Sequence, residues 1–193
     1  MIKFIVFSVL IFSTLVSFAQ SNSSLKEYRI TAGIGIANGT KNSVSIGRSL
    51  WLQHAYRFAS KFSIATEYEN LIYKQPNSDL GIAKEFDKIK LNDHNISLLF
   101  KYQLLKTNRL RIEVVSGGTY CIQQKVYYYR QYFAGSLLVF GEITTVSDYK
   151  VPLLTEFEYS LSKTINIQVR VKYNESGNER NTYSAGIGMS VKL

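Results

Sequence analysis

The segment Thr182–Leu193 reads TYSAGIGMSVKL and alternates between two kinds of side chain. Its apolar and aromatic positions are, in order, Tyr183, Ala185, Ile187, Met189, Val191 and Leu193. The positions between them carry small or polar residues. Successive side chains of a β-strand point to opposite faces of a sheet. The segment is therefore predicted to form a strand with one apolar face and one polar face.

The same alternation recurs in seven earlier parts of the chain, and no helical period is sustained over a comparable length. These alternating segments are Tyr28–Ile36, Ser49–Phe58, Phe62–Ile72, Asn95–Leu104, Leu110–Gln123, Val151–Ser162 and Ile165–Tyr173. Together with the last segment they make eight predicted strands.

The connections between the predicted strands differ in length. Three are short turns, at Ser60-Lys61, Thr107-Asn108 and Lys163-Thr164. The others are mostly longer, and comprise Gly39–Asn42, Lys74–Asp93, Lys125–Lys150 and Asn174–Asn181. Within the second of these, Asp79–Ile89 is expected to form a short helix capped by Ser78. An even number of strands joined alternately by short turns and longer loops predicts an all-β fold, an eight-stranded antiparallel up-and-down transmembrane β-barrel.

The size of the side chains indicates which face lies inside the barrel. Six glycines share the polar face: Gly33, Gly35, Gly47, Gly117, Gly186 and Gly188. An eight-stranded lumen is only wide enough for side chains to fill it, so it needs small residues among larger ones. The bulky Ile, Leu, Phe and Tyr residues of the apolar face suit lipid. His54 and Arg48 share the outward parity of Leu50 and Leu52, and the sequence leaves open whether His54 faces lipid or a bulge shifts the register.

Aromatic residues of the apolar face sort into two levels along the strands. Near the short turns lie Tyr28, Tyr56, Phe58, Phe62, Tyr102 and Tyr159, and toward the other end lie Tyr68, Tyr120, Tyr173 and Tyr183. Two aromatic girdles are expected at the two interfaces of a membrane. The ordinary enrichment of Tyr in strands explains the number of aromatics but not this sorting.

Charged residues of the inward face include both acids and bases. They are Glu67, Glu69, Glu113, Glu156 and Glu158 against Lys101, Arg111, Arg170 and Lys172. Charges removed from bulk water must be paired. These nine residues are therefore predicted to form an ion-pair network that plugs the lumen, with Glu156 and Glu158 pairing with Arg170 or Lys172 on the neighbouring strand.

The stretch Lys125–Lys150 is the candidate partner-binding element. It surrounds the turn-like Ala134-Gly135-Ser136 with aromatic and apolar residues, of which we single out Tyr127, Tyr128, Tyr129, Tyr132, Phe133, Leu137 and Phe140. A hairpin rising above the membrane would offer a free edge to a partner's strand. The alternatives are that it packs over the barrel mouth or simply prolongs the strands.

Composition and the first residues limit the remaining classes. The chain has 193 residues, one cysteine (Cys121), two histidines and a formal net charge of +9, so neither an internal disulfide nor a His/Cys metal site is expected. Met1–Ala19 has a positive residue, an apolar run and a small-x-small ending, which is typical of a cleaved signal peptide. The barrel domain is then expected to be Gln20–Leu193.

With these features the sequence resembles the small outer-membrane barrel families of Gram-negative bacteria, OmpA-type and OmpX-like, and above all the family described as outer membrane protein beta-barrel domain. The resemblance spans Tyr28–Leu193 and rests on architecture, on Phe18-Ala19-Gln20 and on a last strand that ends at Leu193, where such proteins usually carry an aromatic residue. Ala-Gly-Ile-Gly occurs in both the first and last strands, at Ala32–Gly35 and Ala185–Gly188. These strands must pair to close a barrel.

The resemblance implies an outer-membrane location and a structural or surface-interaction role, in adhesion or in the envelope. It implies as partners the lipid and lipopolysaccharide of that membrane, the barrel assembly machinery and a surface protein, and no nucleic acid. The alternatives are a narrow porin-like channel, a lipid A-modifying barrel enzyme and, at the level of the fold, a soluble lipocalin-like carrier. No enzyme activity is expected, since His94 and Ser97 are three positions apart and His54 has no serine two positions away. We assign no catalytic, cofactor-binding or metal-binding residue, and no cofactor.

Overall fold

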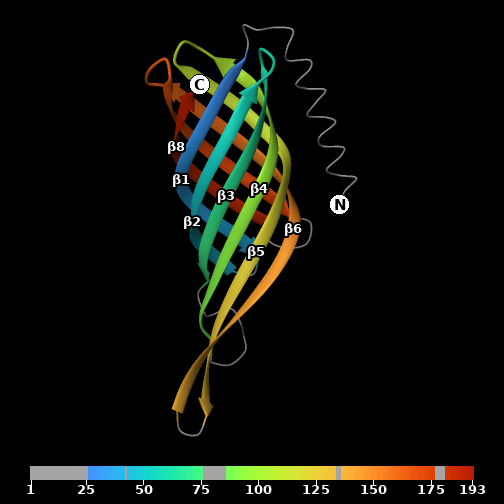
Figure 1. Ribbon diagram of the computed structural model, residues 1–193, viewed down its shortest axis with the longest axis vertical. Coiled ribbons are helices and arrows are strands. Elements are labelled where there is room, and N and C mark those ends of the chain that lie inside the picture. Colours follow the sequence, from blue (N-terminus) through green and yellow to red (C-terminus); the bar gives the residue numbers. More distant parts are fainter. Residues whose placement is uncertain (1–25, 42, 76–85, 134–135, 177–180) are drawn as a thin grey trace.

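The protein forms a closed barrel of eight antiparallel strands in a computed structural model that describes residues 26–41, 43–75, 86–133, 136–176 and 181–193 (Figure 1). The strands are β1 (Glu27–Lys41), β2 (Ser43–Arg57), β3 (Phe62–Gln75), β4 (Phe86–Lys106), β5 (Leu110–Phe133), β6 (Ser136–Ser160), β7 (Ile165–Ser176) and β8 (Asn181–Lys192). Each strand pairs with the next, and β1 pairs with β8 to close the sheet. The predicted fold class is confirmed. The predicted signal peptide lies outside the described residues.

The three short turns are confirmed, and the end of the barrel that carries them is called the turn end below. The longer connections were predicted less well. Strand β1 continues to Lys41, and β5 and β6 run through most of Lys125–Lys150 as a paired hairpin, which Figure 1 shows beyond the opposite end of the barrel. The short helix expected at Asp79–Ile89 is wrong from Phe86 onward, because β4 begins there and pairs with β5; residues 79–85 lie outside the described part.

The two faces of the sheet are those that alternation predicts. Outward apolar side chains are well exposed, with 62% for Ile34 and 53% for Ile187. Inward charged side chains are sequestered, and Glu69, Arg170 and Lys172 are fully buried. The interior is therefore largely polar. Two small apolar clusters interrupt it in the described part of the chain, one of Ala55, Ala65, Leu99, Val115 and Leu154 and one of Ala37, Leu71, Tyr73 and Leu91. Among the residues that the structure describes, no helix reaches the length and apolarity that a membrane crossing requires.

Strand β2 carries His54 and Arg48 outward without a bulge. Its pairing with β1 and with β3 is continuous, so the register stays in phase past both residues. The His54 ring stacks on Tyr28, with centroids 6.2 Å apart and planes inclined by 18°. Tyr28 in turn contacts Tyr56, and Phe62 contacts Tyr102, so His54 belongs to the aromatic girdle at the turn end.

The seam between β1 and β8 joins the two Ala-Gly-Ile-Gly motifs directly. Gly33 is opposite Gly188, and Gly35 is opposite Gly186. The lumen side of this seam is occupied by Trp51 of β2, which is 4% exposed. A methyl group added at Gly33 would overlap the Trp51 ring, and one at Gly186 would lie 2.6 Å from it. The glycines of the seam therefore leave a flat surface against which the indole packs, and we call this surface the glycine bed.

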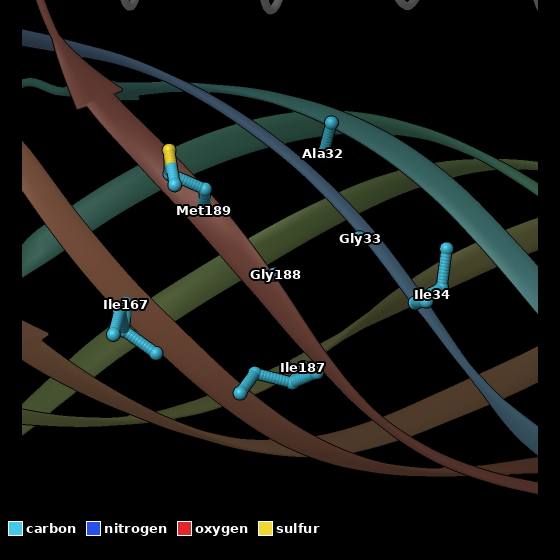
Figure 2. A pocket seen from close by; sticks show the side chains of 7 residues that line it. All are labelled: Ala32, Gly33, Ile34, Ile167, Ile187, Gly188 and Met189. Atoms are coloured by element: carbon cyan, nitrogen blue, oxygen red, sulfur yellow. The ribbon is translucent and has the colours of Figure 1, made fainter.

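The outer side of the same seam is a shallow apolar depression of about 350 Å³. Figure 2 shows its lining from β1, β7 and β8: Ala32, Gly33, Ile34, Ile167, Ile187, Gly188 and Met189. The depression exists because small residues alternate with bulky ones along the seam. It lies on the face that the barrel presents to lipid.

Candidate functional site: a packed polar lumen and a protruding hairpin

The centre of the lumen holds two acids of β3 and two bases of β7. Arg170 reaches Glu67 at 2.7 Å and Glu69 at 2.6 Å, and Lys172 reaches both acids at 2.7 Å. We call these four residues the central quartet. The Arg170 guanidinium also lies 3.7 Å from the Trp51 ring centroid, in cation–π geometry. The indole is thus held between the glycine bed and a buried arginine.

A second group of charges continues the packing toward the turn end. Lys101 donates to Glu156 at 2.5 Å and to the Gln53 side-chain oxygen at 2.5 Å. Gln53 in turn donates to Glu156 and to Glu67 of the central quartet, both at 3.0 Å. One amide therefore joins the two groups into a continuous hydrogen-bonded array.

A third group fills the lumen at the turn end. Arg29 reaches Glu158 at 2.7 Å and Glu113 at 3.0 Å, and Arg57 reaches Glu113 at 3.4 Å. Arg111 contacts Glu158 at 3.6 Å. Arginine suits such a position because its planar fork binds two carboxylates at once and always carries its charge.

The structure brings all nine predicted lumen residues into ion pairs, but the partners differ from those expected along the β6–β7 ladder. Glu156 lies opposite Arg170 in register, yet the bases of β7 extend across the lumen to β3. Five further charged residues take part: Glu27, Arg29, Arg57, Asp93 and Lys150. Arg29 and Arg57 lie on the predicted inward face, so their parity was a usable signal; Asp93 and Lys150 fell in predicted loops.

The charges of this network balance. The ion pairs of the described residues join seven acids, Glu27, Glu67, Glu69, Asp93, Glu113, Glu156 and Glu158, with seven bases, Arg29, Arg57, Lys101, Arg111, Lys150, Arg170 and Lys172. A balanced and hydrogen-bonded set avoids the large free energy cost of a lone buried charge. The ion-paired residues of the described lumen therefore carry no net charge.

Glu27 marks the turn-end rim of the network, outside the aromatic girdle. Its carboxylate accepts two hydrogen bonds from Arg111, at 2.9 and 3.2 Å. Burial alone would raise the pKa of Glu27, but the hydrogen bonds and charge of Arg111, with the charges of Arg29 and Arg57, lower this pKa to about 2. An acid with a lowered pKa stabilises the fold above its unfolded-state value of 4.5, and this contribution is lost as the pH falls from there toward 2.

Substituting Glu27→Gln is therefore expected to destabilise the folded barrel at pH 7 by about 1 kcal/mol, since the pair is partly solvent-screened. The difference from wild type should shrink as the pH falls from 5 to 3. Urea titrations in detergent, read by the gel shift of the folded barrel, measure it. Glu175→Gln, at an exposed position on β7, is the control. A wild-type advantage that does not change with pH would contradict the role of the ionised Glu27.

The hairpin that continues β5 and β6 has a free edge. Its pairing runs from Lys125 opposite Thr144 to Phe133 opposite Ser136. On the other side of β6, pairing with β7 starts only at Lys150, and among the described residues no strand covers the β6 edge from Ser136 to Tyr149. The stretch thus forms a hairpin, as expected, and this hairpin prolongs two strands of the barrel, which was one of the stated alternatives. The predicted contact residues Tyr127, Tyr128, Tyr129, Tyr132, Phe133, Leu137 and Phe140 all lie on these two strands.

The base of the hairpin, where β6 leaves the barrel, carries exposed side chains. Ile143 is 67% exposed and Tyr149 is 74% exposed, and the Tyr149 ring contacts Tyr120 of β5. The single cysteine, Cys121, is buried on the inward face nearby, and its thiol is free. Among the described residues no group of three or more His, Cys, Asp or Glu side chains could hold a metal ion.

Comparisons with known proteins place the fold among transmembrane barrels. No protein-family model matches the chain, and no curated protein matches it. Among solved structures it is similar to Ail, the attachment invasion locus protein of Yersinia pestis, with a TM-score of 0.59 and 8% identity over 88% of this chain and 99% of Ail. It is also similar to the outer membrane protein OprG of Pseudomonas aeruginosa, with a TM-score of 0.61 and 14% identity over 88% and 96% of the two chains.

A third similar structure is neisserial surface protein A, with a TM-score of 0.54 and 14% identity over 86% of this chain and 97% of that one. The structural similarity establishes a shared fold. At sequence identities this low, the role of a residue in one protein cannot be assigned to a residue in another. The shared fold is the eight-stranded transmembrane barrel. It is also the fold of the small outer-membrane families that the sequence resembles.

Proposed function

We propose that this chain is an integral outer-membrane protein of a Gram-negative bacterium that acts at the cell surface through the β5–β6 hairpin, above a plugged lumen. The main support for the proposal is that two features occur together on one molecule. A lipid-facing apolar surface surrounds the barrel, and a strand edge that no other described strand covers extends beyond it.

The hairpin supports an interaction role because an open strand edge is a template for another strand. Within the described part of the chain, no strand forms a ladder with the outer side of β6 from Ser136 to Tyr149, and proteins usually shield long edges of this kind. An extended segment of a partner could add to β6 by backbone hydrogen bonds. Ail, by its name an attachment protein, was also solved with the heparin analogue sucrose octasulfate. Its role makes attachment the first activity to test.

The network supports a structural lumen rather than a channel. Buried, balanced and mutually paired charges span the interior from the turn end to Lys150. The enzyme alternative has little support, because His54 stacks on Tyr28 and the hydrogen bonds of His94 are to Tyr68, Asn70 and Asn92. A lipid A-modifying activity would appear as loss or gain of an acyl chain in the mass spectrum of lipid A mixed with the protein.

The proposal predicts that removing the hairpin tip abolishes attachment and leaves the barrel intact. We expect cells that express a deletion of Gln131–Phe140 to lose adhesion to surfaces coated with extracellular matrix proteins. The variant should still fractionate with the outer membrane and show a heat-dependent shift on denaturing gels. External protease should cleave the wild-type hairpin on intact cells.

Two results would count against the proposal, each against a different part. Unchanged adhesion by a correctly folded deletion variant contradicts the interaction role of the hairpin. Release of the wild-type chain as a soluble periplasmic protein contradicts the membrane location and favours the lipocalin-like alternative.

A further inference from the structure

A hydrogen-bonded polar cluster lies on the outward face of β3 and β4. The Tyr68 hydroxyl lies 2.8 Å from Nδ1 of His94, and the Asn70 amide nitrogen lies 3.1 Å from the same atom. The Asn92 amide nitrogen lies 3.0 Å from His94 Nε2, and Asn70 donates to the Asn92 oxygen at 3.0 Å. Three side chains thus converge on one imidazole, on a face that is mostly apolar toward the turn end.

The cluster begins where the apolar surface ends. Tyr68, Ile96, Tyr120 and Tyr149 form one outward row across β3 to β6, opposite one another in register. The next outward row toward the hairpin contains Asn70, His94, Ile122 and Ser147. Aromatic rows of this kind lie at the headgroup level of a membrane. The cluster therefore lies just outside the hydrocarbon region, on the hairpin side.

The positively charged side chain of Arg48 lies near the cluster, on the neighbouring strand β2. Arg48 of β2 is exposed on the same outward face and lies opposite Ile72, which lies opposite Asn92. Arg48 and Asn92 are therefore two strands apart, about 10 Å between backbones. The extended guanidinium can cover much of that distance.

The chemistry of the cluster favours an anionic ligand rich in acceptors. A neutral imidazole accepts one hydrogen bond, yet the Tyr68 hydroxyl and two amide groups surround His94. With Arg48 added, N–H and O–H donors outnumber acceptors. Phosphate oxygens take several donors at once and bind a guanidinium through two hydrogen bonds.

We propose that Arg48, Asn70, Asn92 and His94 bind a phosphate group of lipid A in the outer leaflet. The site rests on the proposed membrane location and gives the expected contact with lipopolysaccharide a defined place. It is on the opposite side of β3 and β4 from the lumen network, so the two can be tested independently.

Native mass spectrometry of the protein in detergent, mixed with diphosphoryl lipid A, tests the site. We expect His94→Ala and Arg48→Ala each to reduce the lipid-bound fraction about tenfold. Ser147→Ala, an exposed position in the same outward row, should leave binding unchanged. Wild-type protein should bind dephosphorylated lipid A as weakly as the two variants bind the phosphorylated form.

Three outcomes would overturn the site while leaving the proposed function intact, provided that the variants keep their heat-dependent gel shift. One is equal lipid A binding by wild type and both variants. The second is equal wild-type binding of dephosphorylated lipid A. The third is complete displacement of lipid A by millimolar inorganic phosphate, which would assign the residues to a free anion. Failure of the proposed function itself would show differently, as a chain that does not fractionate with membranes.

Discussion

Replacing Gly33 with alanine is expected to destabilise the folded barrel by about 3 kcal/mol or more. The new methyl group would overlap the Trp51 ring, which lies between the β1–β8 seam and the Arg170 guanidinium. Overpacking of a well-filled interior typically costs 1 to 3 kcal/mol. Gly33 lies in the seam that closes the barrel, so the overpacking would weaken the pairing of β1 with β8. Urea titration in lipid vesicles measures the loss, and Trp51 is the only tryptophan in the chain, so its fluorescence reports directly on this contact.

The matched control is Gly118→Ala, because a methyl group added at Gly118 meets no atom within 4 Å. A second substitution tests whether the loss of stability comes from overlap with the indole or from overlap with the backbone. Trp51→Leu should relieve most of the cost of Gly33→Ala, whose methyl group overlaps only the indole among its nearest neighbours. It should not relieve Gly35→Ala, whose methyl group overlaps the Ala185 carbonyl. Equal stability of Gly33→Ala and Gly118→Ala would contradict this account.

Replacing Arg170 with methionine is expected to destabilise the barrel by about 3 to 5 kcal/mol, because of the two bases of the central quartet only Lys172 then remains to balance the buried Glu67 and Glu69. The same substitution removes the cation from the Trp51 ring. If the network is the plug, water and ions should then pass, and planar bilayers should show a higher conductance than wild type. Arg109→Met makes the same chemical change at an exposed turn and should alter neither property.

A double-mutant cycle tests whether the residues of the central quartet act as a unit. Arg170→Met combined with Glu67→Gln removes one charge of each sign and should cost less than the two single substitutions added together. Additive costs would show that Arg170 stabilises the barrel by packing rather than by pairing. Wild-type conductance comparable to that of a large porin would refute the plug and favour the channel alternative.

Alternation predicted the eight strands and their inward and outward faces, because a lipid-facing barrel imposes a period of two on every strand. The direction of His54, which the sequence left open, is outward, because the register of β2 continues without a bulge past this residue. Trp51 was missed although its parity points inward, because the glycines that accommodate it lie on strands β1 and β8. Their proximity depends on how the barrel closes.

The partners within the lumen could not be predicted for a related reason. Parity gives the face of a charge, but the stagger of the strands decides which charges meet across the interior. Arg170 thus contacts β3 rather than Glu156, its neighbour in register. A hairpin was expected at Lys125–Lys150, but its strands could not be assigned residue by residue, because an edge beyond the membrane is not under the constraint that makes strands alternate.

The central quartet also bears on the order in which the barrel forms. The hydrogen bonds from Arg170 and Lys172 to Glu67 and Glu69 join residues 101 to 105 positions apart. A sheet that closed before β7 arrived would trap two acids of β3 without their bases, at a large free energy cost. Closure is therefore favourable only once nearly the whole chain is in place. The same charges that fill the finished interior discourage smaller, premature barrels.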